Sequence, residues 1–379
     1  NIVIGFGRIE NVIVGIVANQ PLIKAGVLDS DSSDKSARFI RYCDDIDTLV
    51  LCKGSISGSL SNEYEQETSL LFVGSLGLFN PIPYFRLYKF LKHSNIDSIC
   101  DFSGNFAGWV LFVAKLAGIP KRLAFYREVV NQFSPSCFKT FYAKVIKLVM
   151  YLNATKVLSN SEAALDNFHP GWKHKKEKFK VIYNGIDLSL ISNETKSSIR
   201  KQLNIPEYSF VFCHSGRYTK AKNHDMIIKC AIELCKKHND IHFVLIGYGV
   251  DDAYTSIIKQ NNLSCQVHLL GYRKDVMQLL KCADCYYFPS LNEGQPNALI
   301  EAMVSGLSFV ASDIAPIKEA TPDFIHPYLI NPNDYNANLN ALQKAYQEDS
   351  YRDQIRCETW AKQHFEASKL FNDFKIELL

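Results

Sequence analysis

Runs of apolar residues alternate with amphipathic stretches along most of this chain. From about residue 95 onward, four apolar runs predict strands: IDSICDF, KRLAFY, TKVLSN and FKVIYN. Between them, apolar positions recur at helical spacing near residues 105–117, 135–152 and 161–168. Near-continuous apolar strands that alternate with helices are typical of a parallel sheet covered by helices on both faces.

The same rhythm restarts after the segment NGID at residues 184–187. Five further runs predict strands: FVFCHSG, IHFVLIG, QVHLLG, CYYFPS and SFVASD. Helices are predicted near residues 223–238, 253–261, 274–283 and 296–305. Two such series, joined near residue 185, predict an α/β protein with two doubly wound domains that face a cleft. Because ligands bind beyond the carboxyl ends of the strands in such sheets, we search the loops that follow strands for a site.

The first 47 residues do not follow this rhythm. NIVIGFGRI and VIVGIVANQ flank the two-residue turn Glu10-Asn11, which predicts an antiparallel hairpin. A helix is predicted in SDKSARFIRYCDD, with Ser33 or Asp34 as its cap. A nucleotide-binding type of domain would instead begin with a strand, a glycine-rich turn and a helix.

Composition and charge narrow the function classes only slightly. The 379 residues are 47% hydrophobic, which suffices for two domains, and the net charge of +3 gives no indication of a nucleic-acid partner. Eleven scattered cysteines fit a reducing cytoplasm. Cys282 and Cys285 have metal or redox spacing, but no second pair follows, so we interpret both as core residues and expect no metal site. Without a signal-peptide pattern or an apolar run of about 18 residues, we expect a cytoplasmic protein, soluble or peripheral at the membrane.

Two loops that follow predicted strands carry residues suited to an anion. In HSGRYTKAKNHDM, Arg217 and Lys222 lie between a strand and a helix, and together they suit a diphosphate. A solvated basic loop is the alternative. In LIGYGVDD, Gly247 and Gly249 would let the backbone approach a ligand closely, or would simply form a tight turn.

A third loop, LNEGQ, precedes a helix that begins near Pro296. Proline suits the first helical position, and the unpaired N–H groups of Asn297 and Ala298 would then form an anion site with the helix dipole. Glu301 lies in the second turn among apolar residues, and the two hydroxyls of a ribose would satisfy its carboxylate. Glu293 lies at the mouth of the loop. The alternative is a structural ion pair for Glu301 and plain exposure for Glu293.

In combination, these motifs resemble a known enzyme family. NGID, GRYTKAKNH, VLIGYG, HLLGYRKDV and ADCYYFPSLNEGQPNALIEAMVSGLSFVASD resemble the family-four (group 1) retaining glycosyltransferases, over about residues 48–379. The resemblance implies the GT-B fold, with two Rossmann-like domains and a nucleotide-diphosphate sugar held mainly by the second. It also implies transfer with retained anomeric configuration and no requirement for a metal or other cofactor.

The resemblance assigns roles to individual residues. Arg217 and Lys222 match the diphosphate-binding pair, and Glu301 matches the glutamate that holds the ribose. Glu293 matches the catalytic glutamate beside the donor sugar. The loop around Tyr272 and Arg273 matches the one that lies against the base. The other donor-side positions are Gly247, Gln295, Pro296, Asn297 and Ala298.

The opening segment resembles a different family. GFGRIENVIVGIVANQPLIKAGVLDSDSSDKSARFIRYCD, within residues 1–45, is similar to the carboxyltransferase subunit of biotin-dependent acyl-CoA carboxylases. That family's glycine-rich oxyanion loops do not follow, so we expect no carboxyltransferase chemistry from this segment. We divide the chain into this segment (1–47), an acceptor-side domain (48–185), a donor domain (186–360) and a C-terminal helix (361–379), for which a crossing back to the first domain is one arrangement.

The predicted function is transfer of a sugar from a nucleotide-diphosphate sugar, carrying UDP or GDP, to a glycan or lipid-linked acceptor in surface polysaccharide synthesis. Two alternatives stay open: a GT-B sugar-nucleotide-binding protein or epimerase without transferase activity, and an acyl-CoA carboxyltransferase. Lys139, Lys144 and Lys147 among apolar residues, with the basic cluster at 173–180, indicate either contact with the inner face of an anionic membrane or a packed helix and a solvated loop.

Overall fold

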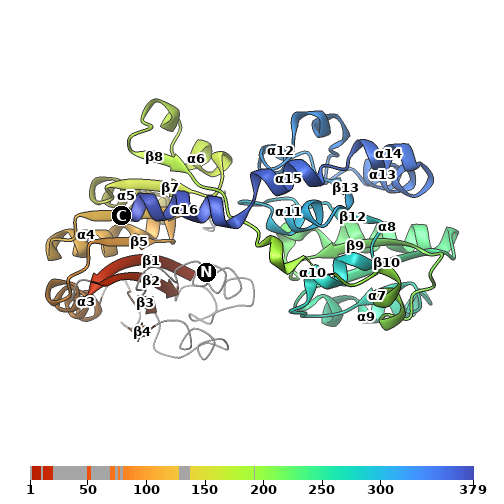
Figure 1. Ribbon diagram of the computed structural model, residues 1–379, viewed down its shortest axis with the longest axis horizontal. Helices are drawn as coiled ribbons and strands as arrows, with labels where there is room; N and C mark the ends of the chain where they lie inside the picture. Colours follow the sequence, from red (N-terminus) through yellow and green to blue (C-terminus); the bar gives the residue numbers. More distant parts are fainter. Residues whose placement is uncertain are drawn as a thin grey trace. The chain divides into compact units, whose positions relative to one another are not determined.

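The computed structural model describes residues 2–9, 12–19, 49–52, 69–72, 76, 80–127, 137–191 and 193–379 (Figure 1). The helix predicted within residues 33–45 lies outside this part of the chain. The chain forms two compact units, one of Asn1–Tyr183 with Ser368–Leu379, the other of Asn184–Ala367. Within the described residues, no helix is long and apolar enough to cross a membrane.

The second unit is built on a parallel five-stranded sheet in the order β11-β10-β9-β12-β13. The strands are β9 (Phe210–Ser215), β10 (Ile241–Ile246), β11 (Val267–Leu269), β12 (Cys285–Phe288) and β13 (Ser308–Ala311). Apolar runs fill them because both faces are covered: Tyr286, Tyr287 and Phe288 are fully buried. The strand order reverses between β9 and β12, and in doubly wound sheets this switch point is where ligands bind.

Helices of the second unit follow the strands as the sequence pattern predicts. They are α7 (Lys196–Gln202), α8 (His224–Lys237), α9 (Val250–Gln260), α10 (Val276–Leu279), α11 (Asn297–Val304), α12 (Ala315–Glu319), α13 (Tyr335–Gln347), α14 (Asp349–Gln354) and α15 (Glu358–His364). Helix α8 buries Ile227, Ala231 and Leu234 at helical spacing and leaves its polar face in solvent.

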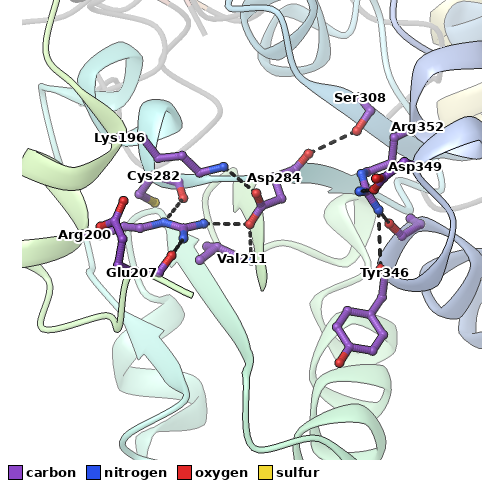
Figure 2. Close-up of polar contacts among 11 residues, drawn as sticks. Lys196, Arg200, Glu207, Val211, Cys282, Asp284, Ser308, Tyr346, Asp349 and Arg352 are labelled. Atoms are coloured by element: carbon purple, nitrogen blue, oxygen red, sulfur yellow. Dashed lines mark hydrogen bonds and ion pairs between the residues drawn. The ribbon is translucent and has the colours of Figure 1, made fainter. Parts of the chain in front are cut away.

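An ion pair with a buried arginine joins α7 to the amino-terminal ends of β9 and β12 (Figure 2). Asp284, just before β12, accepts hydrogen bonds at 2.7 Å from both the Arg200 guanidinium and the backbone N–H of Val211. Arg200 is only 3% exposed and also donates to the Cys282 carbonyl at 3.0 Å. Lys196, which is more exposed, pairs with the same carboxylate. The arrangement satisfies the buried guanidinium at several of its donors.

The first unit holds a parallel four-stranded sheet, β5-β6-β7-β8. Its strands are β5 (Ser98–Asp101), β6 (Lys121–Tyr126), β7 (Lys156–Ser159) and β8 (Phe179–Val181), and its helices are α3 (Ile82–His93), α4 (Gly108–Ala117), α5 (Cys137–Asn153) and α6 (Glu162–Phe168). The core between them includes Leu87, Ile99, Leu111, Met150 and Val157.

An antiparallel pair of strands confirms the predicted hairpin, whose turn residues Glu10 and Asn11 lie outside the described part of the chain. β1 (Ile2–Ile9) pairs with β2 (Val12–Asn19), with Ile2 opposite Asn19 and Ile9 opposite Val12. β1 lies beside β5, and β2 lies beside β3 (Leu49–Cys52), which pairs in parallel with β4 (Ser69–Phe72) (Figure 1). The hairpin therefore lies between the two parallel sheets of the first unit. The strand pairing that the structure shows for β1 and β2 is with each other.

The last helix, α16 (Ala367–Leu378), packs within the first unit. Phe374 contacts the rings of Phe102 and Phe125 at centroid distances of 5.9 and 5.8 Å. Glu377 forms ion pairs with Lys156 and, at 2.8 Å, with Lys180. Burial alone would raise the pKa of Glu377, but hydrogen bonds from the two lysines lower it. These contacts join the C-terminus to β7 and β8.

Candidate functional site

The loops after β9, β10 and β11 are hydrogen-bonded to one another at the carboxyl edge of the second sheet. Gly216 N–H donates to the Ile246 carbonyl at 2.8 Å, and Gly247 N–H donates to the Gly271 carbonyl at 2.7 Å. Pairing of backbone groups across loops extends the sheet beyond its strands. These loops, which carry five of the eleven predicted site residues, are thus held in a fixed order.

The close packing of these loops explains why a glycine occupies position 247. A Cβ atom on Gly247 would lie 2.0 Å from the Gly216 carbonyl oxygen and 3.0 Å from the Arg217 nitrogen. The backbone that approaches Gly247 closely is therefore that of the neighbouring loop. Gly249, with φ +78°, precedes α9 in the left-handed conformation that favours glycine.

The loops after β9 and β12 meet through a charged pair. Lys222 ends the short helix η5 (Lys220–Lys222), and its Nζ lies 2.8 Å from Glu293 Oε1. The two side chains are 17% and 9% exposed, and the ammonium lies 4.9 Å from the centre of the Phe288 ring. Leu291 N–H also donates to the Ala221 carbonyl at 2.8 Å. Glu293 is therefore a partly buried partner of Lys222, and the alternative of plain exposure does not hold.

Asn223, which the sequence pattern did not indicate as a site residue, connects the loop after β9 to two other segments by hydrogen bonds. It has φ +57° and precedes α8 in the left-handed conformation. Its Nδ2 donates to the carbonyls of Pro289 at 3.0 Å and Pro332 at 2.9 Å. An asparagine directly before a predicted helix is a signal for such a position, because asparagine tolerates positive φ. The two carbonyls it holds could not be predicted.

Two buried histidines lie beneath the same loops and were also missed. His214 Nδ1 donates to the Tyr287 carbonyl at 2.9 Å, and no described residue pairs with its Nε2. The His224 ring lies perpendicular to it at 4.9 Å, with Nε2 3.2 Å from the Gly216 carbonyl. Burial lowers the pKa of His214 far below its usual value and that of His224 to about 4. Both imidazoles are therefore neutral near pH 7.

The start of α11 differs from the prediction by one residue. Pro296 is the residue before the helix, with ψ 68°, and Asn297 is the first helical residue. The Asn297 N–H donates to the Gln295 carbonyl at 2.9 Å, so the expectation that it is unpaired is wrong. No described residue accepts a bond from the N–H of Ala298, which keeps one donor of the predicted anion site.

The side chains of Gln295 and Asn297 contact the NGID segment. Gln295 Oε1 accepts from the Asn184 N–H at 2.5 Å, and its Nε2 donates to the Asn184 carbonyl at 3.0 Å. Asn184 Nδ2 also lies 3.2 Å from Asn297 Oδ1. These amides fix the loop before α11 against the first residue of the second unit, a role that sequence spacing alone does not reveal.

Glu301 lies in the second turn of α11, as predicted, and is 8% exposed. Its charge is close enough to Tyr286 to be one cause of that tyrosine's raised pKa, after the larger effect of burial. The Tyr286 hydroxyl is 2.8 Å from Ser215 Oγ, at the carboxyl end of β9. Glu301 is thus placed near the switch point of the sheet.

The remaining predicted residues lie on the rim of these loops. Arg217 is half-buried directly after Gly216, and Lys222 packs its side chain near that glycine. Tyr272 is exposed. Arg273 is held by Asp275, at 2.8 and 2.5 Å, and this pairing raises the pKa of Arg273.

Cys282 and Cys285, the pair with metal or redox spacing, lie in the core of this unit. Cys282 and Cys285 are buried free thiols, and burial raises the pKa of each to about 12. They act as core residues, as interpreted from the sequence. In the part of the chain that the structure describes, no group of three or more His, Cys, Asp or Glu side chains could hold a metal ion.

Comparison with protein families assigns most of the chain to two related groups. Residues 195–361 match the glycosyl transferases group 1, and residues 49–190 match glycosyltransferase family 4. Residues 1–53 match the carboxyl transferase domain. Over 79 residues the chain is 42% identical to the carboxyltransferase subunit of propionyl-CoA carboxylase from Haloferax mediterranei, which is 21% of this chain and 15% of that protein.

Individual relatives agree with the family match. The putative glycosyltransferase EpsF of Bacillus subtilis is 26% identical over 252 residues, covering 64% of this chain and 65% of EpsF. An Escherichia coli protein named UDP-Gal:alpha-D-GlcNAc-diphosphoundecaprenol alpha-1,3-galactosyltransferase is 27% identical over 320 residues, covering 78% of this chain and 79% of that protein. The chain thus spans about two thirds to four fifths of these relatives.

Solved structures share the fold. Anabaena HepE, crystallised with UDP and glucose, superimposes with a TM-score of 0.76 at 19% identity, over 95% of this chain and 98% of HepE. A glycosyltransferase from Rickettsia africae gives a TM-score of 0.77 at 17% identity, over 96% of each chain. With its parallel sheets, its strand order and these matches, the chain belongs to the group 1 and family 4 glycosyltransferases of the GT-B fold and carries a carboxyltransferase-like segment at its start.

Proposed function

We propose that this protein transfers a hexose from a nucleotide-diphosphate sugar to a glycan or lipid-linked acceptor, with retention of configuration, in the synthesis of a surface polysaccharide. The observation that carries the proposal is the Lys222–Glu293 pair at 2.8 Å, set in the hydrogen-bonded loops at the switch point of the second sheet. A cation and a carboxylate in one partly buried place suit a ligand that carries both phosphate and sugar hydroxyls.

The diphosphate is assigned to Arg217, Lys222 and the N-terminal end of α11. Arginine offers a planar fork to phosphate oxygens, and Lys222 offers a point charge. The N–H of Ala298, from which no described residue accepts a hydrogen bond, adds a donor at the positive end of the helix dipole. Lys222 forms an ion pair with Glu293 in the structure. When a phosphate binds, Lys222 must therefore divide its hydrogen bonds between the carboxylate and the phosphate.

The two glutamates take different parts of the donor. Glu301, buried near Ser215 and Tyr286, is assigned to the ribose hydroxyls, because a buried carboxylate favours hydroxyl donors. Glu293 is assigned to the sugar, where its negative charge would stabilise positive charge that develops at the anomeric carbon. Arg217 and Lys222 would stabilise the departing diphosphate.

The names of similar proteins support the substrate class. HepE is described in complex with UDP and glucose, and the Escherichia coli relative is named for a UDP-galactose donor and an acceptor on diphosphoundecaprenol. A UDP-hexose and a polyprenyl-linked acceptor are therefore the first pair to test, with GDP as the alternative nucleotide. The proposal places this activity at the inner face of the membrane.

A second function is favoured by one observation. The antiparallel hairpin β1–β2 occupies the place beside β5 where a doubly wound domain would have a parallel strand, a glycine-rich turn and a helix. Loss of that turn would impair the acceptor side and leave the second unit intact. The chain would then bind a sugar nucleotide without transferring it, or would isomerise it as an epimerase does.

Titration calorimetry with UDP, GDP and their hexose derivatives, followed by a transfer assay with a polyprenyl-diphosphate glycan, separates these outcomes. Binding together with product formation supports the transferase. Binding without transfer supports the second function. Absence of binding by every nucleotide contradicts both, and binding of acyl-CoA in its place would support the carboxyltransferase alternative.

A further inference from the structure

Three neighbouring helices of the first unit share an unusual charge. α3, α4 and α5 together contain seven lysine and arginine residues and no aspartate or glutamate. α4 packs against both of the others, and Figure 1 shows all three grouped at one end of the first unit. Because the whole chain carries a net charge of +3, the rest of it is net negative. These three helices therefore carry more positive charge than the net charge of the whole chain.

The same helices expose large apolar side chains. On α5, Phe141 is 67% exposed, Leu148 57% and Leu152 63%, and their spacing places them along one stripe of the helix. The neighbouring helices add Ile82, Phe85, Phe112 and Leu116. Scattered exposed apolar residues are ordinary, but a group of this size on adjacent helices marks an interaction surface.

Exposed cations lie among these apolar side chains. Among the basic side chains that the structure describes on these helices, five are exposed: Arg86, Lys89, Lys92, Lys115 and Lys144. The Lys89 ammonium lies 4.9 Å from the centre of the Phe85 ring, so charge and apolar surface are in direct contact. Lys147, by contrast, is half-buried and donates to the Phe168 carbonyl, so it belongs to the packing of α5. Among the α5 lysines whose side chains the structure describes, the exposed one is therefore Lys144.

We propose that α3, α4 and α5 form a membrane-docking face that binds the headgroups of anionic lipids and inserts its apolar side chains between them. Cations interspersed with exposed Phe and Leu, and no acidic residues, are the composition of helices that lie in the membrane interface. A protein partner fits less well, because the cores of protein interfaces are depleted in lysine. The inference rests on the proposed function in one respect, since a lipid-linked acceptor would be reached from this position.

Sedimentation with lipid vesicles tests the face directly. The full chain should bind vesicles of phosphatidylcholine mixed with phosphatidylglycerol, should bind phosphatidylcholine alone far less, and should dissociate as salt is raised. Two variants should each weaken partitioning at least about tenfold: the triple reversal Lys89→Glu, Lys115→Glu, Lys144→Glu, and the double change Leu148→Glu, Leu152→Glu. A control with the same change of charge, Lys201→Glu, Lys259→Glu and Lys369→Glu, alters exposed lysines outside the three helices and outside the basic cluster at 173–180, and should bind nearly as the unchanged chain does.

Three results would overturn the proposal. The first is that the unchanged chain shows no preference for anionic vesicles. The second is that the control loses as much binding as the triple reversal, which would mean that total charge decides. Finally, sedimentation velocity showing that the unchanged chain dimerises while the Leu148→Glu, Leu152→Glu variant is monomeric would identify the face as an interface between copies. UDP affinity of every variant, measured by calorimetry, reports separately on folding and on the proposed donor site.

Discussion

At the scale of single residues, Lys222 and Arg217 give the most direct test of the donor site. Lys222→Ala and Arg217→Ala should each weaken binding of the nucleoside diphosphate by about 1.5–3 kcal/mol, because each removes a charge-assisted hydrogen bond. Calorimetry measures the affinity. The matching nucleoside, which has no phosphate, should bind each variant as it binds the unchanged chain. Equal loss for the nucleoside would instead indicate a general disturbance of the loops.

Glu293 and Glu301 should separate into two roles. Glu293→Gln releases Lys222 from its carboxylate partner, so plain nucleotide should bind unchanged or more tightly while transfer falls. Glu301→Gln should weaken nucleotide and nucleotide sugar alike. A 2′,3′-dideoxy nucleotide, which lacks the proposed hydroxyl partners, should bind the Glu301→Gln variant and the unchanged chain about equally. If both variants lose plain nucleotide affinity to the same degree, this division of roles is incorrect.

At the scale of elements, the contact between the loops after β9 and β10 depends on Gly247. Gly247→Ala would place a methyl group 2.0 Å from the Gly216 carbonyl, so the two loops must separate and Arg217 must move. Nucleotide binding should fall, and the melting temperature with it. Gly118→Ala is a suitable control, since Gly118 has φ +94° and no atom within 4 Å of the added carbon. It should lower stability through backbone strain and leave nucleotide affinity unchanged.

The ion pair between Arg200 and Asp284 belongs to the same scale, because it joins α7 to two strands (Figure 2). Asp284→Asn leaves a guanidinium that is 3% exposed without its counter-charge and should destabilise the protein by about 3 kcal/mol. Lys196→Ala removes the more exposed partner of the same carboxylate and should lower the free energy of unfolding by less than about 1 kcal/mol. Calorimetric melting of both variants compares them, and equal effects would show that the buried arginine finds another partner.

Elements could be predicted from sequence more fully than contacts. Apolar runs such as CYYF and helical periodicity located the strands and helices of the second unit, because these patterns are local. Pro296 marked the start of α11 within one residue. The pairing of Lys222 with Glu293, and the bonds from Gln295 to Asn184, join residues 71 and 111 positions apart. Such contacts depend on how the loops of separate strands meet, which no local pattern specifies.

At the scale of the whole molecule, the hairpin of the first unit and the donor loops of the second should have separable effects. The second sheet is built from its own strands, so nucleotide binding should not depend on residues 1–47. Transfer should depend on them, because the β1–β2 hairpin stands where a strand, turn and helix would position the acceptor. A chimera in which residues 1–47 are replaced by the corresponding N-terminal segment of the Escherichia coli relative should keep the same UDP affinity and show a higher kcat. The two chains are compared by calorimetry and by transfer to a polyprenyl-linked glycan. Equal turnover by both would show that the hairpin is compatible with acceptor positioning, and a change in UDP affinity would show that the two units are coupled in donor binding.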